Sequence, residues 1–455
     1  MLRKFKKLSR IYLTLYIRQT LKFLLKRVIL VIFPLSFLFI ISLPPDKPEI
    51  FFEVKDHSVK THSYLSEYKE ISTLHKRFES RKFKTVLNNQ RRTDTSHLTS
   101  LNFLVLEYDK IFGQTKYCQY FKKTENNYEK GKQKVYLDEC PYRNCIFTCN
   151  HSLINDANAI LFSGPDLENV KFSKQELYEN LMSSIIDRPS QIWIVWNDEA
   201  NKVSDELDIF KFNWTMSYRL ESEISDCSYG CKYPKIGEII NPVEFKKEIS
   251  YQFKSRNNTA VWFVSNCDSN YRLKFASNLK NYYPIEVYGS CSKYVQSGFF
   301  ESLFDYFKPK KCGRDTECEY EKLIANKFYL SFESKNCSNY MTEKVWKMLY
   351  LGIIPVVIQP NRQFYELSLP QNSFIHAQDF DYDPKKLADY LTYVSSDFEM
   401  YYSYLKWKLD YDVVFTGYQN EKRRLCELCT KLNTENSIIY YNKVSDFFND
   451  QCIIN

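Results

Sequence analysis

Residues 328–358, FYLSFESKNCSNYMTEKVWKMLYLGIIPVVI, hold the pattern that decides the fold. An apolar run typical of a buried strand ends at Glu333, and a polar loop follows it. A helix is expected to begin near Thr342, because apolar residues then recur at helical spacing as far as Leu351. A second strand-like run follows at 353–358. A strand, a crossover helix and another strand predict a unit of parallel β-sheet.

The N-terminus of this expected helix is a candidate anion site. Free N–H groups and the positive end of the helix dipole suit a diphosphate. Lys344 lies in the first turn, where a cation opposes the dipole unless an anion sits beside it. The residues alone favour an exposed lysine on an ordinary amphipathic helix, and the anion site remains the alternative.

Strand-like and helix-like segments alternate on both sides of this unit. Apolar runs that indicate strands occur at 103–106, 159–162, 192–196, 260–264, 285–289, 327–332 and 353–358. Helical spacing occurs at 176–186, 271–282, 343–351 and 384–412. The fold class we predict is α/β, with two facing Rossmann-like domains at 101–250 and 251–430 and a C-terminal tail at 431–455. Such domains bind ligands at the carboxyl ends of their strands.

The distribution of charge argues against a nucleic-acid partner. The chain has 455 residues and a formal net charge of +8. Nine cations precede the first acidic residue, namely Arg3, Lys4, Lys6, Lys7, Arg10, Arg18, Lys22, Lys26 and Arg27. The remaining 428 residues therefore carry a net charge of −1, which is not the electrostatic footprint of a nucleic-acid binder.

The basic segment 1–27 is better explained by the apolar run that follows it. Residues 28–43 are uncharged and somewhat shorter than the roughly 20 residues of a typical membrane span. Cations on the N-terminal side place that end in the cytoplasm, so the rest of the chain is expected in a lumen or outside the cell. We predict an uncleaved signal anchor at 28–43 and a stem at 44–100. A cleaved signal peptide is the alternative.

The cysteines and the glycosylation sequons agree with an oxidising compartment. The chain has 14 cysteines, an even number that favours disulfides over zinc, although Cys426-x-x-Cys429 alone fits either. The pairing is left open. Other close groups are Cys140/Cys145/Cys149, Cys227/Cys231 and Cys312/Cys318. Glycosylation is predicted at the four sequons, Asn150, Asn213, Asn257 and Asn336.

Four segments in order resemble the α1,3-fucosyltransferase family. Residues 328–358 resemble its donor motif, Phe-Tyr-Leu-x-Phe-Glu followed by Tyr-x-Thr-Glu-Lys and Pro-Val-Val. Residues 212–219, FNWTMSYR, resemble the family's Phe-Asn-Trp-Thr-Met-Ser-Tyr-Arg, and 264–267, VSNC, its Val-Ser-Asn-Cys with an Arg downstream. Residues 196–199, WNDE, resemble its Glu-Ser-Pro region. The resemblance covers about 101–429.

The resemblance implies a two-domain fold of the GT-B type, a Golgi membrane location in single-pass type II orientation, and inverting transfer from GDP-β-L-fucose. The acceptor would be an N-acetylglucosamine-containing glycan on the first domain, with GDP-fucose on the second. Glu199 matches the family's base, with Asp198 as a fallback. Arg272 and Lys344 match its phosphate-binding positions. Further donor contacts are implied at Glu343, Tyr218, Arg219 and Glu333.

Some residues depart from the family pattern or leave alternatives open. Leu220 stands where the family has a second Arg, and Ala200-Asn201 replaces Ser-Pro after the base, which leaves the acceptor preference open. The acids Asp379, Asp381 and Asp383 are interpreted as solvated, and no metal cofactor is expected. A homodimer is left open. A catalytically silent relative that binds glycans or a GDP-sugar is the alternative function.

Overall fold

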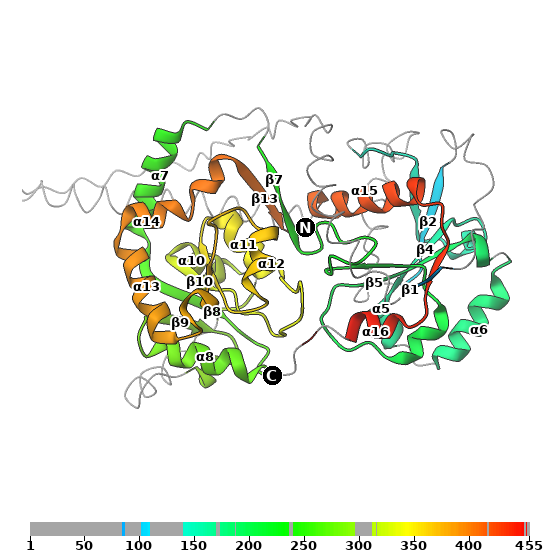
Figure 1. Cartoon of the computed structure of the whole chain (residues 1–455), viewed down its shortest axis with the longest axis horizontal. Coiled ribbons are helices and arrows are strands. Elements are labelled where there is room, and N and C mark those ends of the chain that lie inside the picture. Colours follow the sequence, from blue (N-terminus) through cyan, green and yellow to red (C-terminus); the bar gives the residue numbers. More distant parts are fainter. Residues whose placement is uncertain are drawn as a thin grey trace, which may run out of the picture.

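The computed structural model shows two lobes side by side, each with a β-sheet at its centre (Figure 1). The structure describes residues 84–86, 102–109, 140–169, 173–186, 188–235, 240–295, 312–314, 316–415, 418–449 and 452. The predicted basic tail 1–27, the anchor 28–43 and nearly all of the stem 44–100 lie outside these residues. Among the residues described, no helix is long and apolar enough to cross a bilayer.

The first domain is built on a sheet of five parallel strands in the order β3-β2-β4-β5-β6. The strands are β2 (Phe103–Glu107), β3 (Cys145–Thr148), β4 (Ala159–Ser163), β5 (Ile192–Asn197) and β6 (Trp214–Ser217). Side chains at neighbouring positions of one strand lie on opposite faces of the sheet and join different hydrophobic cores, as Ile194 and Val195 do. Both faces are therefore covered, which explains why these strands are continuous apolar runs rather than alternating ones.

The second domain repeats this plan with the strand order β12-β11-β10-β8-β9. Its strands are β8 (Asn257–Phe263), β9 (Ile285–Tyr288), β10 (Asn326–Leu330), β11 (Ile354–Val357) and β12 (Ile375–His376). If the five strands of each sheet are numbered 1 to 5 along the chain, both sheets have the strand order 2-1-3-4-5. This order is typical of doubly wound folds, which bind ligands where the strand order reverses. The predicted α/β class with parallel sheets is confirmed.

Helices cover both faces of the second sheet. Its helices are α7 (Pro242–Ser255), α8 (Asn270–Lys280), α10 (Glu317–Ile324), α11 (Glu343–Leu351), α12 (Arg362–Ser368), α13 (Pro384–Ser396) and α14 (Phe398–Ser403). Side chains of α7, α8 and α13 share one core with the sheet, whereas α11 and α12 pack on its other face around Val357. Helix α11 begins at Glu343, as predicted, and ends at Leu351, where Gly352 caps it in the left-handed conformation.

The C-terminal segment returns to the first domain, which corrects the predicted boundary at 430. Helix α15 (Tyr418–Thr434) lies on one face of the first sheet, where Leu425, Leu428 and Leu432 join its core. Helix α16 (Val444–Asn449) packs on the opposite core with α6 (Lys174–Ser184). Residues 431–449 are therefore part of the first domain and not a free tail. The short helix α5 (Gly164–Glu168) follows β4.

Two small antiparallel pairs complete the connections. Strand β7 (Gly230–Pro234) pairs with β13 (Tyr411–Phe415) between the lobes, and β1 (Lys84–Val86) pairs with β14 (Ile439–Tyr441) on the first domain. A Cβ atom at Gly230 would lie 2.3 Å from the Trp346 ring, so β7 packs directly on α11. This packing fixes the preceding Tyr229 beside the boundary between the domains.

The cysteines form disulfides, as predicted. Six bonds join pairs of described cysteines, namely Cys140–Cys426, Cys145–Cys429, Cys227–Cys231, Cys267–Cys291, Cys312–Cys318 and Cys337–Cys452. Cys149 is also disulfide-bonded, and none of the described cysteines is free. The zinc alternative for Cys426 and Cys429 is wrong, because each of them is bonded to a cysteine of the first domain and thereby anchors α15 there.

The structure contradicts one of the four predicted glycosylation sites. Asn213 is fully buried, and its side-chain oxygen accepts a hydrogen bond from the Trp193 backbone N–H at 2.8 Å. Its amide nitrogen donates to the Ile439 carbonyl at 3.0 Å. A glycan has no room there, whereas Asn150 and Asn257 are exposed and Asn336 is partly buried. Adjacent sequence cannot show this difference, because the partners of Asn213 are distant in the chain.

We therefore expect that peptide mapping of protein from a eukaryotic secretory host will recover Asn213 without a glycan. Peptides that contain Asn150 and Asn257 should carry one, because both side chains are exposed. Enzymatic deglycosylation in heavy-oxygen water marks each formerly glycosylated asparagine with a mass shift that mass spectrometry detects. The peptides with Asn150 and Asn257 are the internal positive controls for the peptide with Asn213. Recovery of glycosylated Asn213 in folded protein would contradict the packing described here.

Candidate active site

The predicted donor motifs meet where the strand order of the second sheet reverses. Strands β8 and β10 are neighbours there, and residues 264–267 follow one while Phe332 and Glu333 follow the other. Arg272 of α8 links the two segments by donating to the Phe332 carbonyl at 2.9 Å and to the Asn266 carbonyl at 2.6 Å. This edge is where a doubly wound domain is expected to bind its ligand.

Arg272 retains one unsatisfied donor at this edge. The residue is only 3% exposed, and its Nε has no hydrogen-bond partner among the residues that the structure describes. Burial lowers the pKa of the guanidinium, and the nearby Glu333 partly offsets this effect. Arginine remains charged under such a shift. The side chain is thus a fixed positive charge with donor capacity to spare, consistent with its predicted role toward a phosphate.

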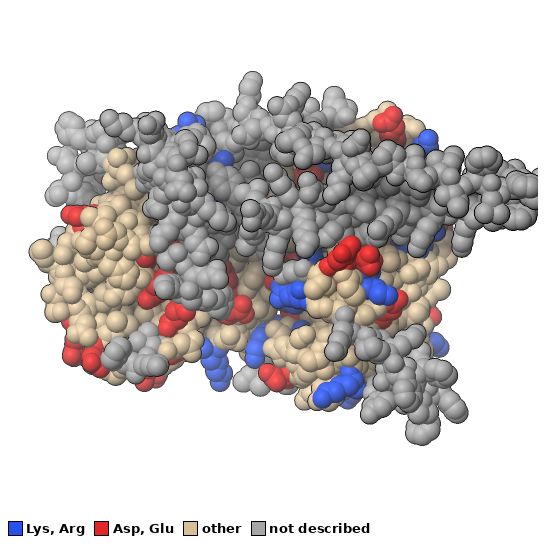
Figure 2. Space-filling model, turned by 180° about the vertical axis from the view of Figure 1, so that it is seen from behind, with Lys and Arg blue, Asp and Glu red and all other residues tan. Residues whose placement is uncertain are grey.

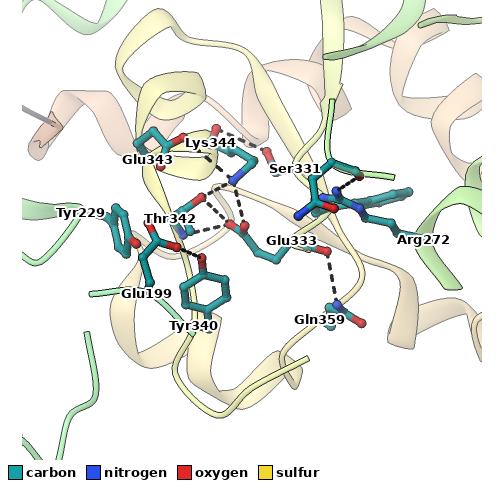
Figure 3. Close-up of polar contacts among 12 residues, drawn as sticks. Glu199, Tyr229, Arg272, Ser331, Glu333, Tyr340, Thr342, Glu343, Lys344 and Gln359 are labelled. Carbon is teal, nitrogen blue, oxygen red and sulfur yellow. Dashed lines mark hydrogen bonds and ion pairs between the residues drawn. The ribbon is translucent and has the colours of Figure 1, made fainter. Parts of the chain in front are cut away.

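Glu333 fixes the start of α11 and the position of Lys344 (Figure 3). Its carboxylate is fully buried and accepts from the Thr342 backbone N–H and hydroxyl, both at 2.8 Å. Its other oxygen accepts from Lys344 Nζ at 3.0 Å. Three hydrogen bonds therefore hold the Glu333 carboxylate at the N-terminus of α11. Its direct contact with the donor remains a prediction.

The side chain of Lys344 is largely enclosed. The interpretation that the residues alone favoured, an exposed lysine on an ordinary amphipathic helix, is therefore wrong. The Lys344 side chain is 27% exposed and also donates to the Thr342 hydroxyl at 2.7 Å. Burial lowers the pKa of its amine, but the carboxylates of Glu333 and Glu343 outweigh that effect and raise it overall. The result is a permanently charged ammonium group at the helix N-terminus, partly open to solvent.

Glu343 lies beside Lys344 in the first turn of α11. Its carboxylate is 3.9 Å from Lys344 Nζ and is bonded to Arg314. Burial raises the pKa of Glu343, but the positive charges of Lys344 and Arg314 outweigh burial and lower it overall. Glu343 is thus an ionised acceptor in the predicted donor region. Its contact with a ribose or sugar hydroxyl remains a prediction.

Glu199 reaches across the boundary between the domains. It lies two residues beyond β5 of the first domain, and its carboxylate accepts a hydrogen bond from the Tyr340 hydroxyl of the second domain at 3.4 Å (Figure 3). Burial raises the pKa of Glu199, and the negative charges of Asp198 and Glu343 add to this effect. The Tyr340 hydrogen bond and Lys344 oppose it. A carboxyl group with a raised pKa is suited to accept a proton.

Aromatic side chains surround this carboxylate. Tyr218 and Tyr340 pack edge to face with ring centroids 5.0 Å apart, and Tyr229 contacts Tyr340 with centroids 6.2 Å apart. Tyr218 is therefore in the predicted site, together with Tyr340 and Tyr229, which the sequence interpretation did not single out. Tyr340 lay within the quoted donor motif, so that motif offered a signal for it.

Asp198 is excluded as the fallback base, because its oxygens are occupied. Arg424 of α15 donates to both oxygens of Asp198, to Oδ2 through Nη1 and to Oδ1 through Nη2 at 2.8 Å. The Ser228 hydroxyl also donates to Oδ1, at 2.6 Å. Trp196 Nε1 donates to the other at 2.8 Å. This arrangement keeps Asp198 as a structural carboxylate whose negative charge lies next to Glu199. Arg424 was missed, because nothing local connects it with residue 198.

Arg219 does not join the donor cluster, contrary to prediction. The side chain is 1% exposed and lies over the Phe447 ring of α16, 4.0 Å from the ring centroid. Its Nε is 3.4 Å from a Glu221 oxygen. Residues next to each other after β6 point in different directions, so Tyr218 faces the other domain while Arg219 supports the first-domain core. Arg219 is a structural residue here.

The three aspartates that follow β12 each have their own role. Asp379 pairs with Arg362 at 2.5 Å, Asp381 pairs with Lys386 at 2.7 Å, and Asp383 caps α13. Within the described part of the chain, no three His, Cys, Asp or Glu side chains gather as metal ligands would.

Charged side chains of both signs lie on the described surface. Seen from behind, Asp and Glu side chains lie on both domains, and on the second domain they lie beside Lys and Arg (Figure 2).

Two family models match the chain over most of its described length. "Fucosyltransferase, N-terminal" matches residues 104–230, and "Glycosyltransferase family 10 (fucosyltransferase) C-term" matches residues 253–447. Together they cover more than half of the chain, and they include Glu199 and Lys344 respectively. The chain belongs to glycosyltransferase family 10. The second match extends through α15 and into α16, which the structure places on the first domain of this family 10 member.

Individual relatives of this family 10 chain carry fucosyltransferase names. "Glycoprotein 3-alpha-L-fucosyltransferase A" of Drosophila melanogaster is 29% identical over 329 residues, which cover 71% of this chain and 58% of the relative. "Alpha-(1,3)-fucosyltransferase 4" of Bos taurus is 30% identical over 254 residues, or 54% of this chain and 58% of the relative. The matched region thus spans somewhat more than half the length of these relatives.

Among solved structures, a crystal structure of an α1,3-fucosyltransferase is similar over 75% of this chain and 93% of that chain, with 14% identity and a TM-score of 0.41.

Proposed function

We propose that the protein is an α1,3-fucosyltransferase that transfers L-fucose from GDP-β-L-fucose, with inversion, to an N-acetylglucosamine-containing glycan. The observation that carries this proposal is the position of Glu199, a first-domain carboxylate with a raised pKa that faces Tyr340 and the Lys344 region of the second domain. The family membership and the names of the relatives support the same reaction.

In the proposed mechanism, Glu199 accepts the proton of an acceptor hydroxyl as its oxygen attacks the anomeric carbon of fucose. The bond from that carbon to the β-phosphate oxygen breaks on the opposite face, and GDP leaves with both bonding electrons. Negative charge grows on the diphosphate while the sugar acquires oxocarbenium character. Arg272 and Lys344 are fixed cations at the expected diphosphate position and would stabilise that charge. We propose that no metal ion is required.

We further propose a GT-B-type arrangement in a single-pass type II protein of the Golgi membrane. The basic segment 1–27, the apolar run 28–43 and the disulfides of the body support a membrane-anchored, lumenal enzyme. Imaging of the tagged chain with a Golgi marker, together with protease protection of the C-terminus in intact vesicles, tests this location. Accessibility of the C-terminus from the cytoplasmic side would contradict it.

The decisive test supplies the purified full-length chain, in detergent, with GDP-fucose and a panel of acceptors. The panel contains an N-glycan core, a LacNAc arm and a LacdiNAc arm, and linkage analysis identifies the product. We expect α1,3-linked fucose on at least one acceptor and the release of GDP. A catalytically silent binder would retain affinity for GDP or glycans but would release no GDP. Treatment with a chelator in the same assay tests metal independence.

The raised pKa of Glu199 predicts how the rate depends on pH. Only the ionised carboxylate accepts a proton, so kcat/KM should fall as the pH falls through the pKa of Glu199. Because burial, Asp198 and Glu343 raise that pKa, the acid limb should lie above the ordinary glutamate value of about 4.3. Glu343→Gln removes one negative neighbour and should shift the limb to lower pH. A limb that does not move in this variant would contradict the electrostatic contribution of Glu343.

A further inference from the structure

The last described residues connect the first domain to the donor loop of the second. Helix α16 packs in the first-domain core, and Cys452 follows its last residue by only three positions. Cys452 is disulfide-bonded to Cys337, which lies in the loop between β10 and α11. The two cysteines also face each other as an isolated antiparallel β-bridge. A segment anchored on one domain is thus covalently joined to the other.

The first-domain end of this connection lies on the loop that carries Glu199. Asn449, the last residue of α16, accepts a hydrogen bond from the Val203 N–H at 2.8 Å and donates to the Val203 carbonyl at 2.7 Å. Val203 is buried and lies four residues after Glu199. A reciprocal pair of bonds fixes both the position and the orientation of the Asn449 amide, because one rotamer must satisfy both.

The tether between these two points is short. Cys452 is three positions after Asn449, and an extended chain of that length spans at most about 11 Å. Cys337 therefore cannot move far from the Val203 loop. Cys337 also shares a small apolar core with Ala200, which follows Glu199 directly, and with Tyr340, and Cys452 packs against this core. The packing and the covalent path hold together the same two loops.

We infer that Asn449 and the Cys337–Cys452 disulfide form an interdomain strap that positions Tyr340 against Glu199 during transfer. Asn449 and the disulfide are positioning elements, because they act on Glu199 and Tyr340 through the loops that carry these two residues. The inference rests on the proposed function. The phosphate side of the site is held in a different way, because Lys344 and Thr342 are bonded to Glu333 within the second domain. Loss of the strap should therefore slow the chemical step more than it weakens donor binding.

The test uses the full-length chain and compares Asn449→Ala, the double variant Cys337→Ser/Cys452→Ser, and all three changes together. We expect kcat to fall at least about tenfold in each, because small misplacements of catalytic groups have large effects on rate. The Kd for GDP should change less than about twofold. The triple variant should be no slower than the double variant, since two links of one strap are not additive.

Ser445→Ala is the matched control. Ser445 anchors the opposite end of α16 through its hydroxyl, which donates to Asp208 at 2.7 Å, and it lies outside the strap. Its kcat should stay near the wild-type value. Thermal unfolding shows whether each variant is folded. If the double cysteine variant does not fold, Asn449→Ala alone tests the strap, because it retains every disulfide.

The outcomes separate the two proposals. A folded wild-type chain that transfers no fucose refutes the proposed function. If the wild-type chain is active and the folded strap variants keep its kcat, the strap is refuted. Equal losses in kcat and in affinity for GDP also refute it. So does a fully additive loss of kcat in the triple variant.

Discussion

Glu199→Gln is expected to abolish most fucose transfer while leaving the binding of GDP intact. The substitution keeps the size of the side chain and an oxygen that can accept the hydrogen bond from Tyr340, which in the wild type measures 3.4 Å. It removes the only function that the proposal assigns to this residue, namely the acceptance of a proton. General bases typically contribute about 10²- to 10⁴-fold to a rate, so kcat should fall by about that factor.

The experiment on Glu199 measures initial rates with a good acceptor and the Kd for GDP by calorimetry. Glu206→Gln is the matched control, because Glu206 is an exposed carboxylate of the same domain that lies outside the site. It should keep full activity. Retention of more than about a tenth of wild-type kcat in Glu199→Gln would show that another group accepts the proton. Asp198 is a poor substitute, because Arg424, Ser228 and Trp196 already occupy its oxygens.

Lys344→Ala is expected to weaken the binding of the donor. Lys344 is the cation at the N-terminus of α11, and hydrogen bonds to charged groups contribute about 1.5–3 kcal/mol. The Kd for GDP and the KM for GDP-fucose should therefore rise about 10- to 100-fold. Lys347→Ala is the matched control, since this lysine of the same helix pairs with Glu319 at 2.9 Å and lies outside the site. It should leave donor saturation unchanged.

A structural explanation for a Lys344 effect must be excluded, because Lys344 neutralises the fully buried Glu333. Removal of one partner of a buried ion pair leaves the other uncompensated. The double variant Lys344→Met/Glu333→Gln removes both charges together. If Lys344 contacts the diphosphate, donor affinity stays low in this variant. Recovery of wild-type affinity would show that the lysine only balances Glu333.

Much of the fold followed from local patterns. The runs at 192–196 and 260–264 are apolar at consecutive positions, which is typical of strands in a sheet covered on both sides. The start of α11 followed from helical spacing and a polar loop, and the motifs that surround Glu199, Arg272 and Lys344 identified the family. These signals lie within a few residues of one another, so a single sequence displays them.

Contacts between distant residues decided the rest. The return of α15 to the first domain, the pairing of Cys140 with Cys426, and the Asp198–Arg424 ion pair all join residues more than 200 positions apart. The burial of Asn213 and the direction of the Arg219 side chain also depend on such partners.

The sequence by itself thus determined the α/β class, the order of the motifs and the identity of the charged groups. Only the tertiary structure decided which of these groups meet. Glu199 and Tyr340 contact each other because β5 and the β10–α11 loop end at one boundary, and the C-terminal segment links the two domains there. The physical reason is that periodicity and propensity act over a few residues, whereas the proximity of two domains depends on how complete surfaces pack.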